Sequence, residues 1–151
     1  MLAPILAAVA LSTAAASQAD PLKDCAPATL DAVFVCLDRH WTAREEFKAL
    51  AYDDISGGHF GVGMWMRNNW GLWGGGPLAR HFNDLGITHA DDMSGIILKS
   101  YWLHLHGCPL RLEDQVGYYQ GYWNLPENAD VDDYIDSKPN LDCTSHRETA
   151  Q

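Results

Sequence analysis

Apolar side chains recur at steps of three and four residues along much of the chain, which is the spacing of one buried face of an α-helix. The first such stretch, residues 27–40, predicts a helix. Its apolar positions are Leu30, Val33, Phe34 and Leu37. Thr42 and Glu45 have the spacing of a capping box and predict a second helix over residues 43–52. Residues 53–58 are rich in Asp, Gly and Ser and predict a loop.

The next stretch, residues 59–73, reads HFGVGMWMRNNWGLW and is apolar over much of its length. At about 100° per residue, its large apolar side chains fall on both sides of a helix. One side carries His59, Val62, Met66, Trp70 and Trp73, and the other carries Phe60, Met64, Trp65 and Leu72. Because no face is left for solvent, we expect a buried, Trp-rich helix at the centre of the fold.

Three further helices are predicted beyond this stretch. A short one covers residues 77–85, and a long one starts at Asp91 or Asp92 as its N-cap and runs to about His106. The last covers residues 113–123. No segment has the alternation of a strand. The fold class is therefore all-α, a bundle of about five to six helices around the central one.

The two ends of the chain predict its domain organisation. Residues 1–19 carry no charge and are mostly small or apolar, and small residues precede a cleavage point before Asp20. They predict a signal peptide, so we expect a periplasmic or secreted protein. The helical domain then covers residues 20–123. Residues 124–151 mix Asp, Asn, Pro and Ser without apolar periodicity and predict an acidic, irregular tail.

The net charge of the chain limits the classes of partner that it is expected to bind. Ten Lys and Arg face twenty Asp and Glu, which gives a formal net charge of −10. This balance disfavours nucleic acid and anionic membrane surfaces. No membrane span is expected once the signal peptide is removed, because its apolar run is too short. A cationic protein or a cell-envelope ligand is compatible with the charge.

Four cysteines in an exported chain predict two disulfides, formed by Cys25, Cys36, Cys108 and Cys143. If residues 28–37 are helical, Cys25 and Cys36 lie more than about 10 Å apart, because a helix rises about 1.5 Å per residue. We therefore favour bridges from these two to Cys108 and Cys143. Their spacing matches no zinc site, so metal binding by these thiols is not expected.

Two blocks of sequence, HFGVGMWMRNNWGLW and GITHADDMSGIIL, resemble an uncharacterised bacterial family, a domain of unknown function. The resemblance extends from about Leu30 to Trp123. It implies a domain built around the two blocks, and it implies no activity.

Polar side chains in the first block point to a contact with the second. Arg67, Asn68 and Asn69 project about 100° apart from a helix expected to be buried, so they need partners. A buried guanidinium requires an anion, and the DDMS motif offers Asp91 and Asp92. Asp91 is placed to cap the long helix, which leaves Asp92 freer, although either can serve. A structural network is favoured, and a cleft where Arg67 and the two asparagines bind an anionic ligand is the alternative.

The same region holds the candidates for catalysis, which are His59, Arg67, Asp91 and Asp92. A metal site formed by His59, His89 and one of these aspartates is a less favoured alternative, and no metal is expected.

Two functions remain open from the sequence. The serine, zinc and nucleotide motifs are absent, so neither a catalytic template nor a cofactor is indicated. We favour a non-enzymatic binding module of the inhibitor or immunity type. The alternative is a cell-envelope hydrolase. Among the aromatic residues, Trp102, Tyr118, Tyr122 and Trp123 are expected to reach a surface.

Overall fold

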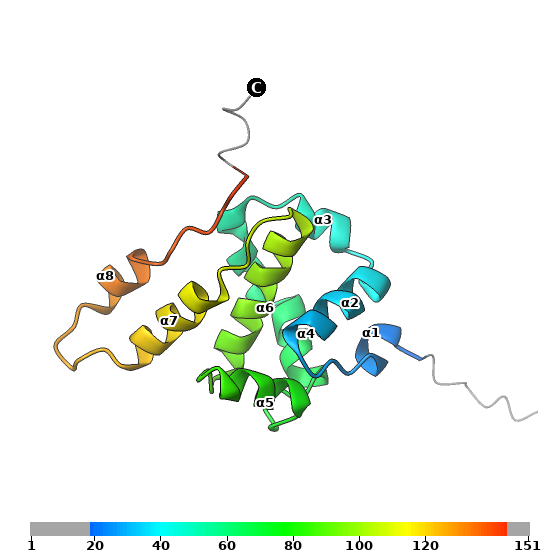
Figure 1. Cartoon of the computed structure of the whole chain (residues 1–151), viewed down its shortest axis with the longest axis horizontal. Helices are drawn as coiled ribbons and strands as arrows, with labels where there is room; N and C mark the ends of the chain where they lie inside the picture. The colour runs from blue at the N-terminus through cyan, green and yellow to red at the C-terminus, as the bar shows by residue number, and fades with distance from the viewer. Residues whose placement is uncertain (1–18, 145–151) are drawn as a thin grey trace, which may run out of the picture.

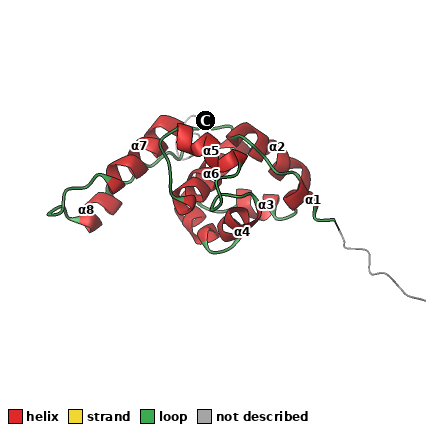
Figure 2. Ribbon diagram, turned by 90° about the horizontal axis from the view of Figure 1, so that it is seen from below, coloured by secondary structure: helices red, strands yellow, loops and turns green. Residues whose placement is uncertain are grey.

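The computed structural model describes residues 19–144, and every regular element within this range is a helix (Figures 1 and 2). The all-α class is confirmed. In chain order the elements are α1 (Pro21–Asp24), α2 (Leu30–His40), α3 (Arg44–Lys48), the 3₁₀ helix η1 (Tyr52–His59), α4 (Val62–Asn69), α5 (Pro77–Asp84), α6 (Ala90–Leu105), α7 (Leu112–Trp123) and α8 (Val131–Asp136). The predicted signal peptide lies outside the described residues, except for Ala19.

The central element is α6, around which most of the other helices pack (Figure 1). Ten of its sixteen residues are buried. Trp102 is among them, with 2% of its surface exposed, and its indole N–H donates to the carbonyl of Leu50 at 3.0 Å. The prediction that Trp102 reaches the surface is therefore wrong.

The predicted central helix over residues 59–73 is also wrong, because this stretch is broken into pieces. The 3₁₀ helix η1 ends at its start, and α4 covers only eight residues in the middle. Gly61 has ψ −107°, outside the helical region, and Gly71 has φ +70°, which favours glycine. α4 packs on α6, and its Met66 and Arg67 are buried, while Met64 is 41% exposed.

The capping and turn motifs in the sequence predict the bounds of the other elements only in part. The second predicted helix shrinks to α3, whose N-cap Ala43 makes no side-chain bond, so the capping box does not form. The predicted loop at residues 53–58 lies inside η1. The N-cap of α6 is His89, also without a side-chain bond, and therefore neither Asp91 nor Asp92 caps this helix.

The segment predicted to be irregular contains α8. Its N-cap Asp130 accepts hydrogen bonds from the backbone amides of Asp132 and Asp133, and the Tyr134 hydroxyl donates to the carbonyl of Tyr118 at 2.7 Å. Further along, Leu141 is buried in the core. We call α7, α8 and the turn between them, residues 112–136, the arm. Both views show its α8 end extending away from the body (Figures 1 and 2).

The disulfides join Cys25 to Cys36 and Cys108 to Cys143, with Cα atoms 6.0 and 5.8 Å apart. The favoured pairing was wrong because Cys25 does not lie on an extension of the α2 axis. Ala26 has φ +42°, which turns the chain after α1, so α1 folds back beside α2. Two disulfides indicate an oxidising environment. Within residues 19–144, no helix combines the length and apolar composition that crossing a bilayer requires.

Candidate functional site

Arg67 lies at the centre of a polar contact between α4 and α6. Its side chain is 4% exposed, and its Nη1 donates a 2.7 Å hydrogen bond to the hydroxyl of Ser94. That hydroxyl donates in turn to the carbonyl of Asp91 at 2.9 Å. The Arg67 Nε lies 3.1 Å from Asp91 Oδ1, without the alignment of a hydrogen bond, so this contact is an ion pair. The guanidinium also lies over the ring of Trp73 at 5.9 Å.

His59, at the end of η1, completes this group. Its Nε2 lies 3.3 Å from the same Asp91 oxygen that contacts Arg67. The Asp91 side chain is 51% exposed, so the group opens to solvent at its carboxylate. We call Arg67, Ser94, Asp91 and His59 the Arg67 cluster. The DDMS motif thus supplies the anion that buried Arg67 needs, and the partner is Asp91.

Asp92 takes no part in the Arg67 cluster. Its Oδ2 accepts a 2.7 Å hydrogen bond from the indole N–H of Trp123 on α7. Partial burial raises the pKa of Asp92, although the Trp123 bond opposes the shift. His89 stacks on Trp123 with ring centroids 3.7 Å apart, and it makes no site with His59. Among the described residues, no three His, Cys, Asp or Glu side chains are grouped to hold a metal ion.

The two asparagines of the first block form hydrogen bonds within that block. Asn68 Oδ1 accepts from the indole N–H of Trp73 at 3.2 Å, and Asn69 Nδ2 donates to the carbonyl of Trp65 at 2.8 Å. Neither touches Arg67 through a hydrogen bond in residues 19–144. An anion site shared by Arg67 and both asparagines is therefore not assembled.

A cavity of about 220 Å³ adjoins the cluster at His59. It lies among η1, α6, α7 and the chain after α8, and its lining consists of Ile55, Ser56, His59, Phe60, Gly95, Leu98, Lys99, Tyr119 and Lys138. Burial, and next the neighbouring charge of Lys138, lower the pKa of Lys99 to about 7. Sequence reasoning missed this pair of lysines, because Lys99 reads as an ordinary polar position on a helix.

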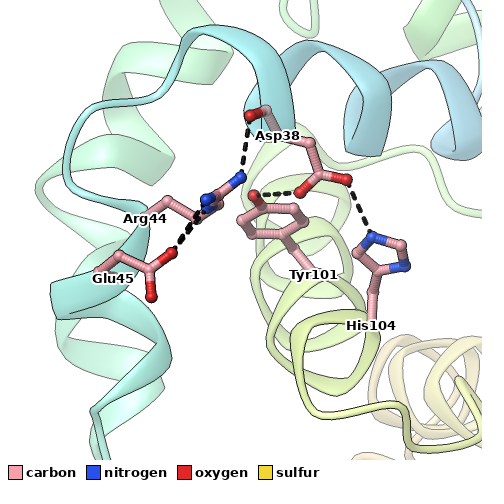
Figure 3. Close-up of polar contacts among 5 residues, drawn as sticks. All are labelled: Asp38, Arg44, Glu45, Tyr101 and His104. Carbon is pink, nitrogen blue, oxygen red and sulfur yellow. Dashed lines mark hydrogen bonds and ion pairs between the residues drawn. The ribbon is translucent and has the colours of Figure 1, made fainter.

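A second polar network, also missed from the sequence, connects α2, α3 and α6 (Figure 3). The Tyr101 hydroxyl donates to Asp38 Oδ1 at 2.9 Å, and His104 Nε2 lies 3.1 Å from Asp38 Oδ2. Arg44 Nη1 donates to the Asp38 carbonyl at 3.0 Å and also pairs with Glu45. Burial, followed by the bond to Asp38, raises the pKa of Tyr101. These contacts link α2, α3 and α6 through their side chains.

Comparison with known proteins gives a family and no activity. Searches of curated proteins and of solved structures return no match. A family model described as a domain of unknown function, DUF6794, matches residues 26–105. This range includes the Arg67 cluster and the helices from α2 to α6, and it ends before the arm. The chain therefore belongs to the DUF6794 family of domains of unknown function.

Proposed function

We propose that this chain is an exported, non-enzymatic binding module whose arm binds a cationic protein. The observation that carries the proposal is the composition of the arm. Residues 112–136 hold seven carboxylates and no Lys, Arg or His. Among these charges, large apolar side chains stand exposed, with Trp123 at 54%, Ile135 at 46% and Val131 at 44%.

The arm and α6 form a shallow aromatic groove of about 310 Å³. It is lined by Asp92, Tyr118, Tyr119, Tyr122, Trp123 and Ile135. Exposed Trp and Tyr side chains beside a pocket are typical of residues that dominate binding energy in protein interfaces. The surrounding carboxylates attract a cationic partner and speed its association, most strongly at low salt. Their charge therefore favours a basic protein as the occupant.

The test measures binding from a cell-envelope extract with the immobilised full chain, followed by calorimetry with the isolated partner. We expect capture of a basic protein that weakens at high salt. Trp123→Ala is expected to weaken binding by about tenfold or more, as a central interface residue does. Asp132→Asn combined with Asp133→Asn is expected to slow association and flatten the salt dependence.

The matched control is Asp53→Asn combined with Asp54→Asn, which removes the same charge from exposed positions on η1. If the η1 and arm variants lower binding equally, net charge alone is responsible and the arm is not the interface. Self-association of the chain through the arm, seen by sedimentation, would replace the cationic partner with a second copy.

A hydrolase that acts on cell-envelope material is the second candidate, and the position of His59 favours it. A histidine held by a carboxylate and facing a cavity has the arrangement of a general base. However, the Asp91 carboxylate is shared with Arg67, which neutralises it. We therefore expect the wild-type chain to show no turnover of envelope substrates that depends on His59. A loss of about 10² to 10⁴ in rate, with His89→Ala unaffected, would establish the enzyme instead.

A further inference from the structure

We propose that the cavity lined by Lys99 and Lys138 binds a small organic carboxylate with an apolar body. The carboxylate accepts hydrogen bonds from the two lysine amines, which lie close to each other, and the body lies against the apolar wall. This site shares only the Tyr119 side chain with the lining of the groove of the arm, and its ligand is a small molecule.

The cavity has walls of two kinds. Ile55, Phe60 and Leu98 provide apolar surface, while Ser56 and the two lysines provide polar groups. Such a combination is typical of sites for small amphiphilic ligands, in which apolar walls contribute affinity and a few polar groups fix orientation.

Tyr119 closes one side of the cavity because α6 has a glycine beneath it. A Cβ atom at Gly95 would lie only 2.5 Å from the Tyr119 hydroxyl oxygen, so any larger residue would displace this ring. Tyr119 is mostly buried, and burial raises the pKa of its hydroxyl above the ordinary tyrosine value, which already lies well above neutral pH. The Tyr119 hydroxyl therefore stays a neutral hydrogen-bonding group in the wall.

The two lysines lack an anionic partner in residues 19–144. No ion pair within this range includes Lys99 or Lys138. Lys99 instead lies over the rings of Tyr118 and Tyr119, at 5.8 and 5.3 Å. Two neighbouring amines without a counter-ion are unusual in a chain with twice as many acidic as basic residues. A bound carboxylate supplies the missing charge.

The titration of Lys99 agrees with this geometry. Burial and repulsion from Lys138 lower its pKa to about 7, and Asp92 opposes them only weakly. Tyr118, Tyr119 and the Asp91-paired His59 complete its surroundings. A carboxylate favours the charged amine, so binding raises this pKa and takes up a proton near pH 7. Affinity is therefore expected to fall as the pH rises above about 7.

The size of the cavity limits the ligand. At about 30 Å³ per water molecule, 220 Å³ corresponds to roughly seven waters, so a compact acid fills it. Benzoate and hexanoate are suitable probes, since each joins one carboxylate to an apolar body. Benzamide keeps the shape of benzoate without its charge, and inorganic phosphate provides charge without an apolar body.

The experiment is calorimetric titration of the full chain at pH 7. We expect benzoate or hexanoate to bind. Benzamide is expected to bind at least about tenfold more weakly because it lacks the charged group, and phosphate at least about tenfold more weakly because it leaves the apolar wall unused. Lys99→Met is expected to weaken benzoate binding by about tenfold or more, and exposed Lys138→Met by a smaller factor. Lys48→Met, on the exposed side of α3, is the matched control and is expected to have no effect.

NMR of the wild-type chain with labelled lysines provides a measurement that does not depend on a variant folding. Saturating benzoate is expected to shift the Lys99 side-chain resonances and to raise the pKa that they report. Absence of this shift, equal binding of phosphate and benzoate, or an equal effect of Lys48→Met would each overturn the proposal. Trp123 lines the groove of the arm but not the cavity, so Trp123→Ala is expected to leave benzoate binding unchanged, and the failure of one proposal does not carry over to the other.

Discussion

Replacing Cys108 and Cys143 together by alanine is expected to lower the free energy of unfolding by about 4 kcal/mol, whereas replacing Cys25 and Cys36 costs about 3 kcal/mol. The bridges join residues 35 and 11 positions apart, and a longer closed loop restricts the unfolded chain more strongly. Urea unfolding followed by circular dichroism measures both values.

The wild-type chain in reductant provides the control, because it loses both bridges without a change of sequence. We expect its melting temperature to fall below that of the oxidised chain. Equal melting temperatures with and without reductant would mean that the disulfides are not structural. If removing the Cys25–Cys36 bridge lowered the free energy of unfolding more than removing the Cys108–Cys143 bridge, the explanation from loop length would be contradicted.

Asp91→Ala is expected to lower the free energy of unfolding by about 2 to 4 kcal/mol, because it leaves the Arg67 guanidinium buried without an anion. Arg67→Met is expected to cost only about 0 to 1 kcal/mol, since it fills a similar volume and the exposed Asp91 carboxylate remains in water. The double variant is therefore expected to be more stable than Asp91→Ala alone. Urea unfolding of the four proteins gives the coupling.

Asp92→Ala is the matched control, since it removes a neighbouring carboxylate whose hydrogen bond, within the described part of the chain, is to exposed Trp123. Its expected cost is less than about 1 kcal/mol. Strictly additive losses for Asp91→Ala and Arg67→Met would show that the ion pair contributes nothing and that the Arg67 cluster has to be abandoned as a stabilising unit.

Helices with an uninterrupted apolar face could be predicted from the sequence. The observed α5, α6 and α7 begin and end within about two residues of the predicted bounds, because apolar spacing marks all three and a glycine follows α5 and α6. The contact between the two sequence blocks could also be predicted, since the cost of burying the Arg67 charge requires an anion and the DDMS motif supplies one. Which of the two aspartates pairs with Arg67 depends on the rotation of α6 about its axis, which the sequence does not specify.

The central element could not be identified from apolar content. Residues 59–73 are as rich in Trp and Met as a core helix, but their glycines allow the chain to leave the helical region. Tyr101 and His104 meet Asp38 across 63 and 66 residues, so their network follows from packing rather than from any local pattern. The lysine pair depends in the same way on where the chain returns after α8.

The Cys108–Cys143 bridge also has a topological consequence. The bridge joins the chain just after α6 to Cys143, so the segment that contains the arm forms a closed loop with a covalent link at its base. One peptide bond cut in the turn between α7 and α8 leaves both pieces attached to the same molecule. A loop tied in this way can change its length or sequence during evolution while the DUF6794 body, residues 26–105, keeps its own packing.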